Sequence, residues 1–348
     1  MLNTIDLLSD TLSLPTKEMY ASIAEAELGD DGRFTNNQGE DPTVNRLQKI
    51  AAEKLGKEDG LFLHSGTMGN MISLLTHANR GDSIIVGEKA HIFTNERGIF
   101  DNNCCGFRSV IVPDFEGYLD LQALERNLRS TTASLVCIEN SHNFRGGTVI
   151  TPEITAAITD VAHKYKTPVH LDGARIFNAA VALKTDIKPL VENVDSVMFC
   201  LSKGLCAPIG SVLVGSHPFI KKAREKRRAW GGQMRQAGIV AAAGIVALEK
   251  MTERLYEDHE LTLRLAQELS EIPVFSIDTL KVNTNILKIS LDNSFMSASE
   301  FSKRLFHEHK IRVGAVSNNE IRIVIYHGVT MEVISETINR IKSFCGQT

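Results

Sequence analysis

Short apolar runs recur along the middle of the chain, and most are separated by segments long enough to form a helix. The runs are Leu61–Leu63, Ile84–Val86, Val110–Val112, Leu135–Ile138, Val169–Leu171, Val197–Cys200 and Val212–Val214. Continuous apolar runs are typical of strands buried on both faces, and strands that alternate with helices form a parallel sheet. We therefore expect an α/β fold with a mostly parallel seven-stranded sheet. The last two runs are too close for a crossover helix, so one of them is expected to be antiparallel.

The segments on either side of these runs have different patterns. Residues 1–20 are expected to form an extended arm. Residues 29–43 are rich in Gly, Asn and Asp without periodicity, which predicts a loop or a lid. Helical spacing of apolar residues predicts helices over Thr43–Leu55, Phe219–Leu248 and Met251–Leu269.

The pattern changes again after residue 272. Strands at Ile286–Ile289 and Ile321–Ile325 alternate with helices near Ala298–His309 and Met331–Phe344, which predicts a small α+β domain. The expected organisation is an N-terminal arm over residues 1–20, a large domain over 21–250 and a small C-terminal domain over 251–348.

Composition narrows the class of protein. The chain has 348 residues, 43% of them apolar, so it can bury a full core, and its net charge of −4 argues against nucleic acid as the main partner. No apolar stretch is long enough to span a membrane, and the N-terminus lacks the features of a signal peptide. Two of the six cysteines, Cys137 and Cys200, lie in apolar runs, as reduced thiols do, so we expect a cytoplasmic protein. The basic residues between Lys221 and Arg228 are expected to form a solvated helix face.

Two of the predicted strands end in residues that suit catalysis. The run that begins at Val169 ends in Asp172, with Arg175 three positions later, and the run that begins at Val197 is followed by Lys203. Open α/β folds bind ligands at the carboxyl ends of their strands. Pyridoxal phosphate enzymes use an aspartate for the ring nitrogen and a lysine that forms a Schiff base. A structural Asp–Arg ion pair and an ordinary surface lysine are the alternatives, but the order of the two strand ends and the apolar residues around Lys203 favour the cofactor.

Other polar groups are expected near the same edge of the sheet. Gly66 and Thr67 begin a helix after the first strand, where they either bind a phosphate or form a plain turn. His91 follows the second strand and suits stacking on a ring or moving a proton. The polar stretch Glu139–Asn143 follows the fourth strand and is expected to converge on the same crevice.

Two arginines further along the chain are candidates for binding an anion. Arg322 lies in the last predicted strand among buried positions, so an ion partner is expected for it. Arg235 follows a Gly-Gly turn, from which it could reach a phosphate.

Several motifs occur in the same order as in a known family of enzymes. They are Ser9-Asp10-Thr11, Gly39-Glu40-Asp41-Pro42-Thr43-Val44-Asn45, Ser65-Gly66-Thr67-Met68-Gly69-Asn70, His170-Leu171-Asp172-Gly173-Ala174-Arg175, Cys200-Leu201-Ser202-Lys203-Gly204 and Gly232-Gln233-Met234-Arg235-Gln236-Ala237-Gly238. Together they resemble the L-threonine aldolases, which belong to the β-eliminating lyase group of fold-type I pyridoxal phosphate enzymes. The resemblance covers residues 6 to about 250 and is weaker towards the C-terminus. It implies retro-aldol cleavage of a 3-hydroxy-amino acid, with threonine or allo-threonine as the default substrate.

The resemblance also implies roles for single residues. Lys203 would bind the cofactor covalently, Asp172 would contact its ring nitrogen, and His91 would stack on its ring, so these three form the catalytic set. The remaining cofactor contacts would come from Gly66, Thr67, Arg175, Ser202 and Arg235. The substrate carboxylate would be held by Ser9, Arg322 and Arg175. No metal is implied, and the family's usual assembly is a homotetramer, a dimer of dimers, with active sites completed across the subunit interface.

Two departures from the family pattern bear on the choice of substrate. Gly32–Gln38 supplies seven residues where the family usually has two, and Arg129–Ser134 lacks a histidine that some members have. The alternatives are a β-eliminating lyase or an aldolase for bulkier 3-hydroxy-amino acids. A non-catalytic assembly protein of the same fold is a further alternative, and the complete set of predicted site residues argues against it.

Overall fold

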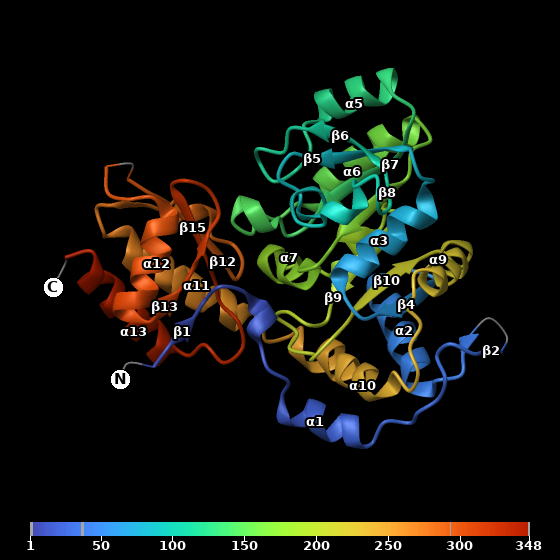
Figure 1. Cartoon of the computed structure of the whole chain (residues 1–348), viewed down its shortest axis with the longest axis horizontal. Helices are drawn as coiled ribbons and strands as arrows, with labels where there is room; N and C mark the ends of the chain where they lie inside the picture. The colour runs from blue at the N-terminus through green and yellow to red at the C-terminus, as the bar shows by residue number, and fades with distance from the viewer. Residues whose placement is uncertain (1–2, 36–37, 293, 347–348) are drawn as a thin grey trace.

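The computed structural model describes residues 3–35, 38–292 and 294–346, and it has a large and a small lobe (Figure 1). The large lobe contains a seven-stranded sheet in the order β4-β10-β9-β8-β7-β5-β6. Its strands are β4 (Asp59–Leu63), β5 (Ser83–Gly87), β6 (Arg108–Val112), β7 (Ala133–Glu139), β8 (Val169–Asp172), β9 (Ser196–Cys200) and β10 (Ser211–Gly215). Each strand contains one of the apolar runs, which confirms the predicted sheet.

The strand directions also agree with the prediction. Strands β5 to β9 pair in parallel, whereas β10 runs antiparallel to both of its neighbours, β9 and β4. One of the last two apolar runs is therefore antiparallel, as their short separation requires. The turn that contains Lys203 lies in the short connection between β9 and β10.

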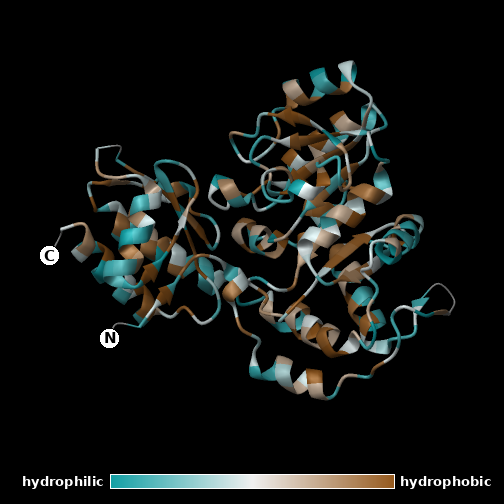
Figure 2. Ribbon diagram, viewed as in Figure 1, coloured by the Kyte–Doolittle hydropathy of each residue, from teal (hydrophilic) through white to brown (hydrophobic). Residues whose placement is uncertain are grey.

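Helices cover both faces of the large sheet. They are α2 (Pro42–Leu55), α3 (Gly66–His77), α4 (His91–Thr94), α5 (Leu121–Ser130), α6 (Pro152–Lys164), α7 (Ile176–Leu183), α8 (Ile187–Val191), α9 (His217–Ala229) and α10 (Gly238–Val246). Neighbouring side chains of one strand enter separate cores, since Leu61 and Leu63 pack with α3 and Phe62 packs with α2. Figure 2 shows the hydrophobic colour concentrated in the strands. Among the helices that the structure describes, not one combines the length and apolar composition needed to cross a membrane.

The small lobe is an α+β unit, as predicted. Its antiparallel sheet has the order β11-β12-β15-β14. These elements are β11 (Phe275–Ser276), β12 (Ile286–Leu291), β14 (Gly314–Ala315) and β15 (Glu320–Val324), with α11 (Leu255–Ser270), α12 (Ala298–His309) and α13 (Met331–Phe344). Helices α12 and α13 have the predicted bounds. Helix α11 begins later than predicted because a π-helical turn over Ala247–Met251 precedes it.

The N-terminal arm connects the two lobes. Strand β1 (Ile5–Asp6) pairs in parallel with β13 (Ile311–Arg312), and Leu7 is buried in the core of the small lobe. Further along, α1 (Lys17–Ala24) buries Met19 in the core of the large lobe. The first two residues of the predicted arm lie outside the described residues, and the predicted domain boundaries stay a prediction.

The helix predicted over Phe219–Leu248 is wrong. Helix α9 ends at Ala229 and α10 begins only at Gly238, and the segment between them contains Gly231 at φ +73°. A positive φ is accessible to glycine and does not continue an α-helix, so the pair of glycines in this segment separates the two helices.

The prediction that the basic residues of α9 are solvated is wrong in part. Arg227 is fully buried, its Nη1 lies 2.7 Å from Oδ2 of Asp31, and the same nitrogen donates to the carbonyl oxygen of Phe62 at 2.8 Å. Arg224, one turn earlier on the same side of the helix, is buried as well. The exposed members are Lys221, Lys222 and Arg228.

The loop predicted over residues 29–43 contains a short hairpin. Strand β2 (Phe34–Thr35) pairs antiparallel with β3 (Gln38–Gly39), and Asn36 and Asn37 lie outside the described residues. Figure 1 shows the hairpin on the side of the large lobe away from the small lobe.

Candidate active site

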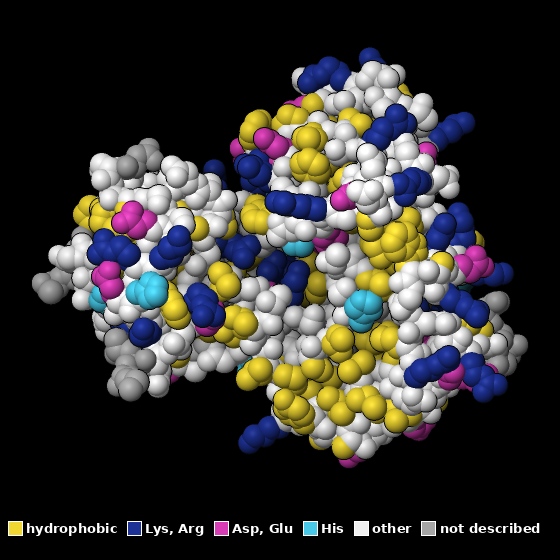
Figure 3. All heavy atoms as spheres, viewed as in Figure 1, with side chains coloured by type: hydrophobic (Ala, Val, Ile, Leu, Met, Phe, Trp, Pro, Cys, Tyr) yellow, Lys and Arg dark blue, Asp and Glu magenta, His cyan; other side chains and the backbone are white. Residues whose placement is uncertain are grey.

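The strand ends of the large sheet bring the predicted site residues towards the hollow between the lobes. His91 follows β5, Asn143 follows β7, Asp172 ends β8, and Lys203 follows β9. Figure 3 shows Lys, Arg, His and acidic side chains gathered in this hollow. The carboxyl edge of the sheet, where α/β folds bind their ligands, is therefore polar and charged.

Lys203 lies in the turn after β9 and is held there by the N-terminal arm. Its carbonyl oxygen accepts a hydrogen bond of 2.6 Å from Oγ of Ser13. Burial raises the pKa of the neighbouring Cys200 thiol, and Lys203, Asp172 and Arg175 act on that pKa through their charges. The three charged groups therefore surround one buried thiol.

Asp172 is buried and both of its oxygens accept hydrogen bonds. Oδ1 accepts from the backbone N–H of Ala174 at 3.0 Å, and Oδ2 accepts from Nδ2 of Asn70 at 3.0 Å. The two donors fix the orientation of the carboxyl group at the end of β8, where an aspartate of a pyridoxal phosphate enzyme would face the ring nitrogen.

Arg175 is buried and bonded on two sides. Its Nε and Nη2 donate to the two oxygens of Asp10 at 2.7 Å each, and its Nη1 donates to Oδ1 of Asn143 at 3.3 Å. Burial alone would lower the pKa of Arg175, but the charge and hydrogen bonds of Asp10 raise it overall. The ion pair of Arg175 is thus made with a residue of the N-terminal arm and not with the nearby Asp172.

Arg322 does not have the ion partner that its position predicts. Its Nη1 donates to Oδ1 of Asn143 at 2.8 Å and its Nη2 to the carbonyl oxygen of Leu8 at 3.3 Å, and both acceptors are neutral. Its Nε is buried with no partner among the described residues. Burial and the charge of Arg175 lower the pKa of Arg322 to about 10. Among the described residues no carboxylate forms an ion pair with this guanidinium group, and a bound anion would supply a direct partner.

Ser9 reaches this region because the arm places Leu8 against Arg322. Its side chain caps a 3-10 turn, where Oγ accepts from the backbone N–H of Thr11 at 3.2 Å. Ser9 is half-buried, and its neighbours in the chain, Leu8 and Asp10, contact Arg322 and Arg175.

His91 is held at the start of α4 by two acidic residues. Its backbone N–H donates to Oε2 of Glu139 at 2.7 Å, and its ring Nδ1 lies 3.2 Å from Oε1 of Glu96. The ring stacks on Phe144 at a centroid separation of 6.4 Å and an interplanar angle of 13°. The guanidinium carbon of Arg322 lies 5.9 Å from the centroid of the same ring. The Phe144 ring therefore contacts both His91, which is predicted to transfer a proton, and Arg322, which is predicted to bind the substrate carboxylate.

Gly66 and Thr67 form the first turn of α3. The Ser65 side chain caps the helix by accepting from the backbone N–H of Met68 at 3.2 Å. A Cβ on Gly66 would lie 2.7 Å from Sγ of Cys200, so only glycine lets the helix start approach β9 this closely. The helix start lies close to the strand end that leads to Lys203, and it presents backbone N–H groups that suit a phosphate.

Two further predicted residues differ in their placement. Ser202 is half-buried in the same turn as Lys203. The Arg235 side chain is largely exposed and forms its ion pair with Asp30, rather than with a residue of the Lys203 region. The structure therefore does not bring Arg235 to the other candidate residues of its own chain.

These residues fit pyridoxal phosphate. The close approach at Gly66 leaves a helix start free of a side chain, and both oxygens of Asp172 accept hydrogen bonds. Lys203 lies in the turn that connects these features. These residues would supply a phosphate site, a ring-nitrogen site and an amine.

Three residues of this region were not predicted as site residues. They are Asp10, Asn70 and Glu96, all of them buried. Asp10 and Asn70 lie within motifs that the sequence singles out, which was the available signal, whereas Asn143 belongs to the polar stretch predicted at this crevice. Glu96 has no such signal, because its link to His91 depends on the turn after α4.

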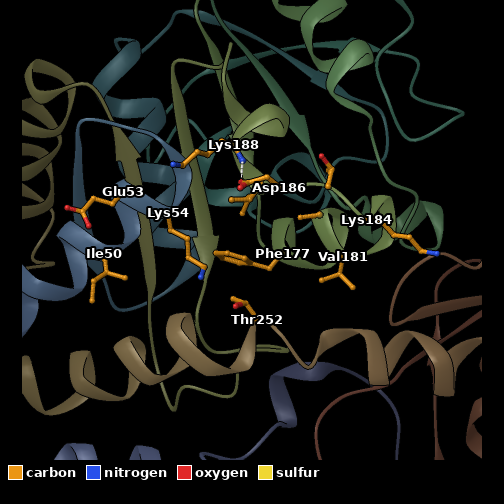
Figure 4. Close-up of a pocket in the computed structure, with 12 residues that line it drawn as sticks. Ile50, Glu53, Lys54, Phe177, Val181, Lys184, Asp186, Lys188 and Thr252 are labelled. Atoms are coloured by element: carbon orange, nitrogen blue, oxygen red, sulfur yellow. Dashed lines mark hydrogen bonds between the residues drawn. The ribbon is translucent and has the colours of Figure 1, made fainter.

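A separate hollow of about 670 Å³ lies on another side of the large lobe, between α2, α7 and α8. Figure 4 shows Lys54, Lys184 and Lys188 around it with their amino groups pointing in different directions. None of the candidate site residues lines this hollow. Its amines do not converge on one point, so it is not the site of the chemistry described above.

The fold and this site define an enzyme of the pyridoxal phosphate-dependent fold type I. A solved structure of a threonine aldolase from Leishmania major has a TM-score of 0.82 and 16% sequence identity, covering 98% of this chain and 99% of its own. At this identity the similarity concerns the fold.

The chain belongs to the β-eliminating lyase family, whose sequence profile matches residues 6–292. Low-specificity L-threonine aldolase 1 of Arabidopsis thaliana is 35% identical to it, over 97% of this chain and 96% of the relative. The low specificity L-threonine aldolase of Escherichia coli K12 is 34% identical, over 98% of this chain and 99% of the relative.

Proposed function

We propose that this protein cleaves L-threonine or L-allo-threonine into glycine and acetaldehyde, with pyridoxal phosphate as its cofactor. Relatives from a plant and a bacterium are named for activity on threonine. The observation that carries the proposal is the arginine pair, in which Arg175 and Arg322 share one amide oxygen of Asn143 and a buried Nε has no partner among the described residues. An amino-acid carboxylate would satisfy this group beside the strand ends of Asp172 and Lys203.

The arginine pair would orient the substrate. A carboxylate held by Arg322, Arg175 and Ser9 fixes the α-carbon in space, and the guanidinium fork defines the direction from which the substrate enters. Binding energy at the carboxylate then selects which bond to the α-carbon can break.

The protein's own groups would supply the proton transfers. Pyridoxal phosphate, when bound, supplies an electron sink for the pair of electrons left on the α-carbon when the Cα–Cβ bond breaks. Lys203 would bind it, Asp172 would keep its ring nitrogen protonated, and the first turn of α3 would bind its phosphate. His91 would accept the proton of the β-hydroxyl group at Nε2, because its Nδ1 faces Glu96. The α-carbon regains a proton after the aldehyde leaves, which completes glycine.

We infer that the enzyme is a homotetramer in the cytoplasm, with active sites completed by a neighbouring subunit. Large apolar side chains on and near α1 are exposed, among them Leu14 at 74% and Tyr20 at 61%. Figure 3 shows an apolar patch over α1 and α10. The separation of Arg235 from the Lys203 region supports a role in the site of a partner subunit, and the six free cysteines suit a reducing compartment.

The first test is the release of glycine and acetaldehyde from L-threonine and L-allo-threonine by the purified holoenzyme. Glycine from either substrate, lost in Lys203→Ala, would establish the aldolase. Ammonia and a keto acid in place of glycine would identify a β-eliminating lyase, and glycine only from bulkier 3-hydroxy-amino acids would identify a different substrate range. A protein that binds no cofactor would be the non-catalytic alternative.

The shared site is tested by mixing two inactive variants. Lys203→Ala and Arg235→Ala are produced together in one cell and purified as a mixed assembly. Recovery of glycine release in the mixture, when each variant alone is inactive, would support a site built from two subunits. Failure to recover activity in a confirmed mixed assembly would contradict it.

A further inference from the structure

A buried asparagine lies between the two acidic residues of the candidate site. Asn70, in α3, is fully buried, and its Nδ2 donates to Oδ2 of Asp172 and to Oε1 of Glu96, each at 3.0 Å. Carboxylates accept hydrogen bonds, so the amide nitrogen of Asn70 must face them. One side chain therefore joins the aspartate at the end of β8 to a glutamate in the turn after α4.

The other end of the amide fixes this orientation. Oδ1 of Asn70 lies 3.1 Å from Nε2 of His170, so the histidine must carry its proton on Nε2. Its Nδ1 then accepts a hydrogen bond from the hydroxyl of Ser73 or Ser196, each at 2.9 Å. Burial lowers the pKa of His170 to about 3, which keeps the ring neutral and preserves this tautomer.

Glu96 connects the asparagine to His91. Glu96 is buried, and the oxygen that accepts from Asn70 also lies 3.2 Å from Nδ1 of His91. Since the carboxylate accepts, His91 donates from Nδ1 and its Nε2 is left without a proton when the ring is neutral. Burial alone would lower the pKa of His91, but the bond to Glu96 and the charges of Asp172 and Glu139 raise it overall.

We propose that Asn70 and Glu96 are positioning residues that hold Asp172 and His91 as one hydrogen-bonded unit. The two N–H groups of the amide keep both carboxylates as acceptors, and Glu96 keeps the His91 proton on Nδ1. Replacing either positioning residue should therefore affect both Asp172, which would hold the cofactor ring, and His91, which would move the substrate proton. The catalytic use of His91 rests on the proposed function, whereas the unit itself rests on contacts within the chain.

A cation is the alternative occupant of this cluster. Ligand atoms of His91, Glu96 and Asp172 lie within 4.8 Å of one another. The contacts of Asn70 favour the hydrogen-bonded unit, because its N–H groups already occupy Oε1 of Glu96 and Oδ2 of Asp172. Oε2 of Glu96 has no partner among the described residues, so it could still bind an ion. Divalent cations therefore form a separate arm of the test.

The experiment compares Asn70→Ala with Thr76→Val in the full-length protein. Thr76 is buried on the same helix, and among the described residues its hydroxyl donates to the backbone of Ile72 alone, at 2.6 Å. The affinity of each cofactor-free protein for pyridoxal phosphate is measured by titration, and the visible absorbance of the bound cofactor is followed against pH. We expect affinity about 10- to 100-fold weaker in Asn70→Ala, as for the loss of a hydrogen bond to a charged group, and the wild-type value in Thr76→Val.

Glu96→Gln tests the other end of the unit with little change of shape. The charged groups that face His91 are Glu96 from the turn after α4, Glu139 from β7 and Asp172 from β8. Removing the charge of Glu96 lowers the pKa of His91, so the rise of kcat with pH moves to lower pH while KM changes little. Glu96→Ala, which also removes the acceptor, is expected to lower kcat by about 10- to 100-fold.

Three results would overturn the proposal. Equal losses of cofactor affinity in Asn70→Ala and Thr76→Val would assign the effect to packing. An unchanged affinity, spectrum and pH profile in both Asn70→Ala and Glu96→Gln would show that the unit has no role. Activation by Mg²⁺ or Mn²⁺ that is abolished by Glu96→Gln would replace the unit with a metal site.

The proposed function and this proposal can fail separately. If the wild-type holoenzyme releases no glycine from threonine, the proposed function fails, and cofactor affinity and absorbance still decide the role of Asn70. If Asn70→Ala does not fold, the near-isosteric Glu96→Gln decides the outcome through the same absorbance titration.

Discussion

Two buried arginine–aspartate pairs have the same closest distance and very different surroundings. Between the lobes, Arg175 makes two hydrogen bonds of 2.7 Å to Asp10, and Asn285 donates to the same carboxylate at 3.2 Å. At α9, Arg227 lies 2.7 Å from Asp31, but neither oxygen of Asp31 has a hydrogen-bond partner among the described residues. The first pair is fully bonded and the second is an ion pair with little hydrogen-bond support.

The difference shows in the pKa values of the two aspartates. Burial raises the pKa of both, but the charge and hydrogen bonds of Arg175, together with Lys203 and Asn285, lower that of Asp10 overall. The pKa of Asp31 stays raised, because its interaction with Arg227 does not offset its burial. Asp10 differs in accepting from two nitrogens of Arg175 and from Asn285, and it favours the charged form at the same closest distance to its arginine.

The largest expected effect is on stability. Arg227→Met leaves Asp31 buried without a counter-charge, so the free energy of unfolding should fall by about 3–5 kcal/mol. Urea unfolding measures this quantity. A stable Arg227→Met protein would mean that the pair contributes nothing.

The second largest expected effect is on activity, and it concerns the pair of Arg175 and Asp10. Asp10→Asn removes the charge that holds Arg175, and we expect kcat/KM for threonine to fall by about 10- to 100-fold, as for the loss of charge-assisted hydrogen bonds. The loss of stability should be smaller than in Arg227→Met, since Arg175 keeps its bond to Asn143. The glycine-release assay measures kcat/KM and urea unfolding measures stability, and a wild-type kcat/KM in Asp10→Asn would show that Asp10 has no role in activity.

A third experiment replaces both members of each pair with apolar residues. Asp31→Leu with Arg227→Met should bring the free energy of unfolding to within about 1–2 kcal/mol of the wild-type value, because no buried charge is left unpaired. Asp10→Leu with Arg175→Met should fold but release no glycine. If the first double variant is as unstable as Arg227→Met alone, the loss comes from packing and not from charge.

The smallest effect is in the pH dependence of stability. A protein that contains a carboxyl group with a raised folded-state pKa loses stability as pH rises from about 3.8 through that raised value. A protein that contains a carboxyl group with a lowered folded-state pKa loses stability as pH falls below about 3.8. The Tm of the wild type should therefore rise relative to that of Asp31→Asn as pH falls towards 3.8. The difference between the wild type and Asp10→Asn should narrow below that pH. Calorimetry from pH 7 to about 3 measures both, and slopes of the same sign would contradict the comparison.

Much of the fold could be predicted from the sequence because its strands are continuous apolar runs. The runs at Leu61–Leu63 and Val197–Cys200 are long enough to stand out, whereas the two-residue strands β1 and β13 are too short to give a pattern. The break between α9 and α10 was missed because glycine also occurs inside helices, so Gly231 alone did not indicate a left-handed residue.

The candidate site could be predicted in part, and the parts differ in physical kind. Lys203 and Asp172 follow apolar runs, which places them at one sheet edge. The burial of Arg227 and the bridge of Asn70 depend on partners distant in sequence, and a polar side chain at helical spacing is normally solvated. The roles of Lys203 and Asp172 were predicted from their strand ends, those of most other residues came from resemblance, and all of them stay predictions.

The N-terminal arm also sets the order in which the molecule can be completed during synthesis. Ile5 pairs with Ile311, and the carbonyl oxygen of Leu8 accepts from Arg322, so this N-terminal segment waits for partners made more than 300 residues later. The sheet of the large lobe is complete by Gly215 and can form earlier. Arg322 therefore reaches its place after that sheet, and a chain released before β15 would retain the sheet with Lys203 but lack the arginine proposed to bind the carboxylate.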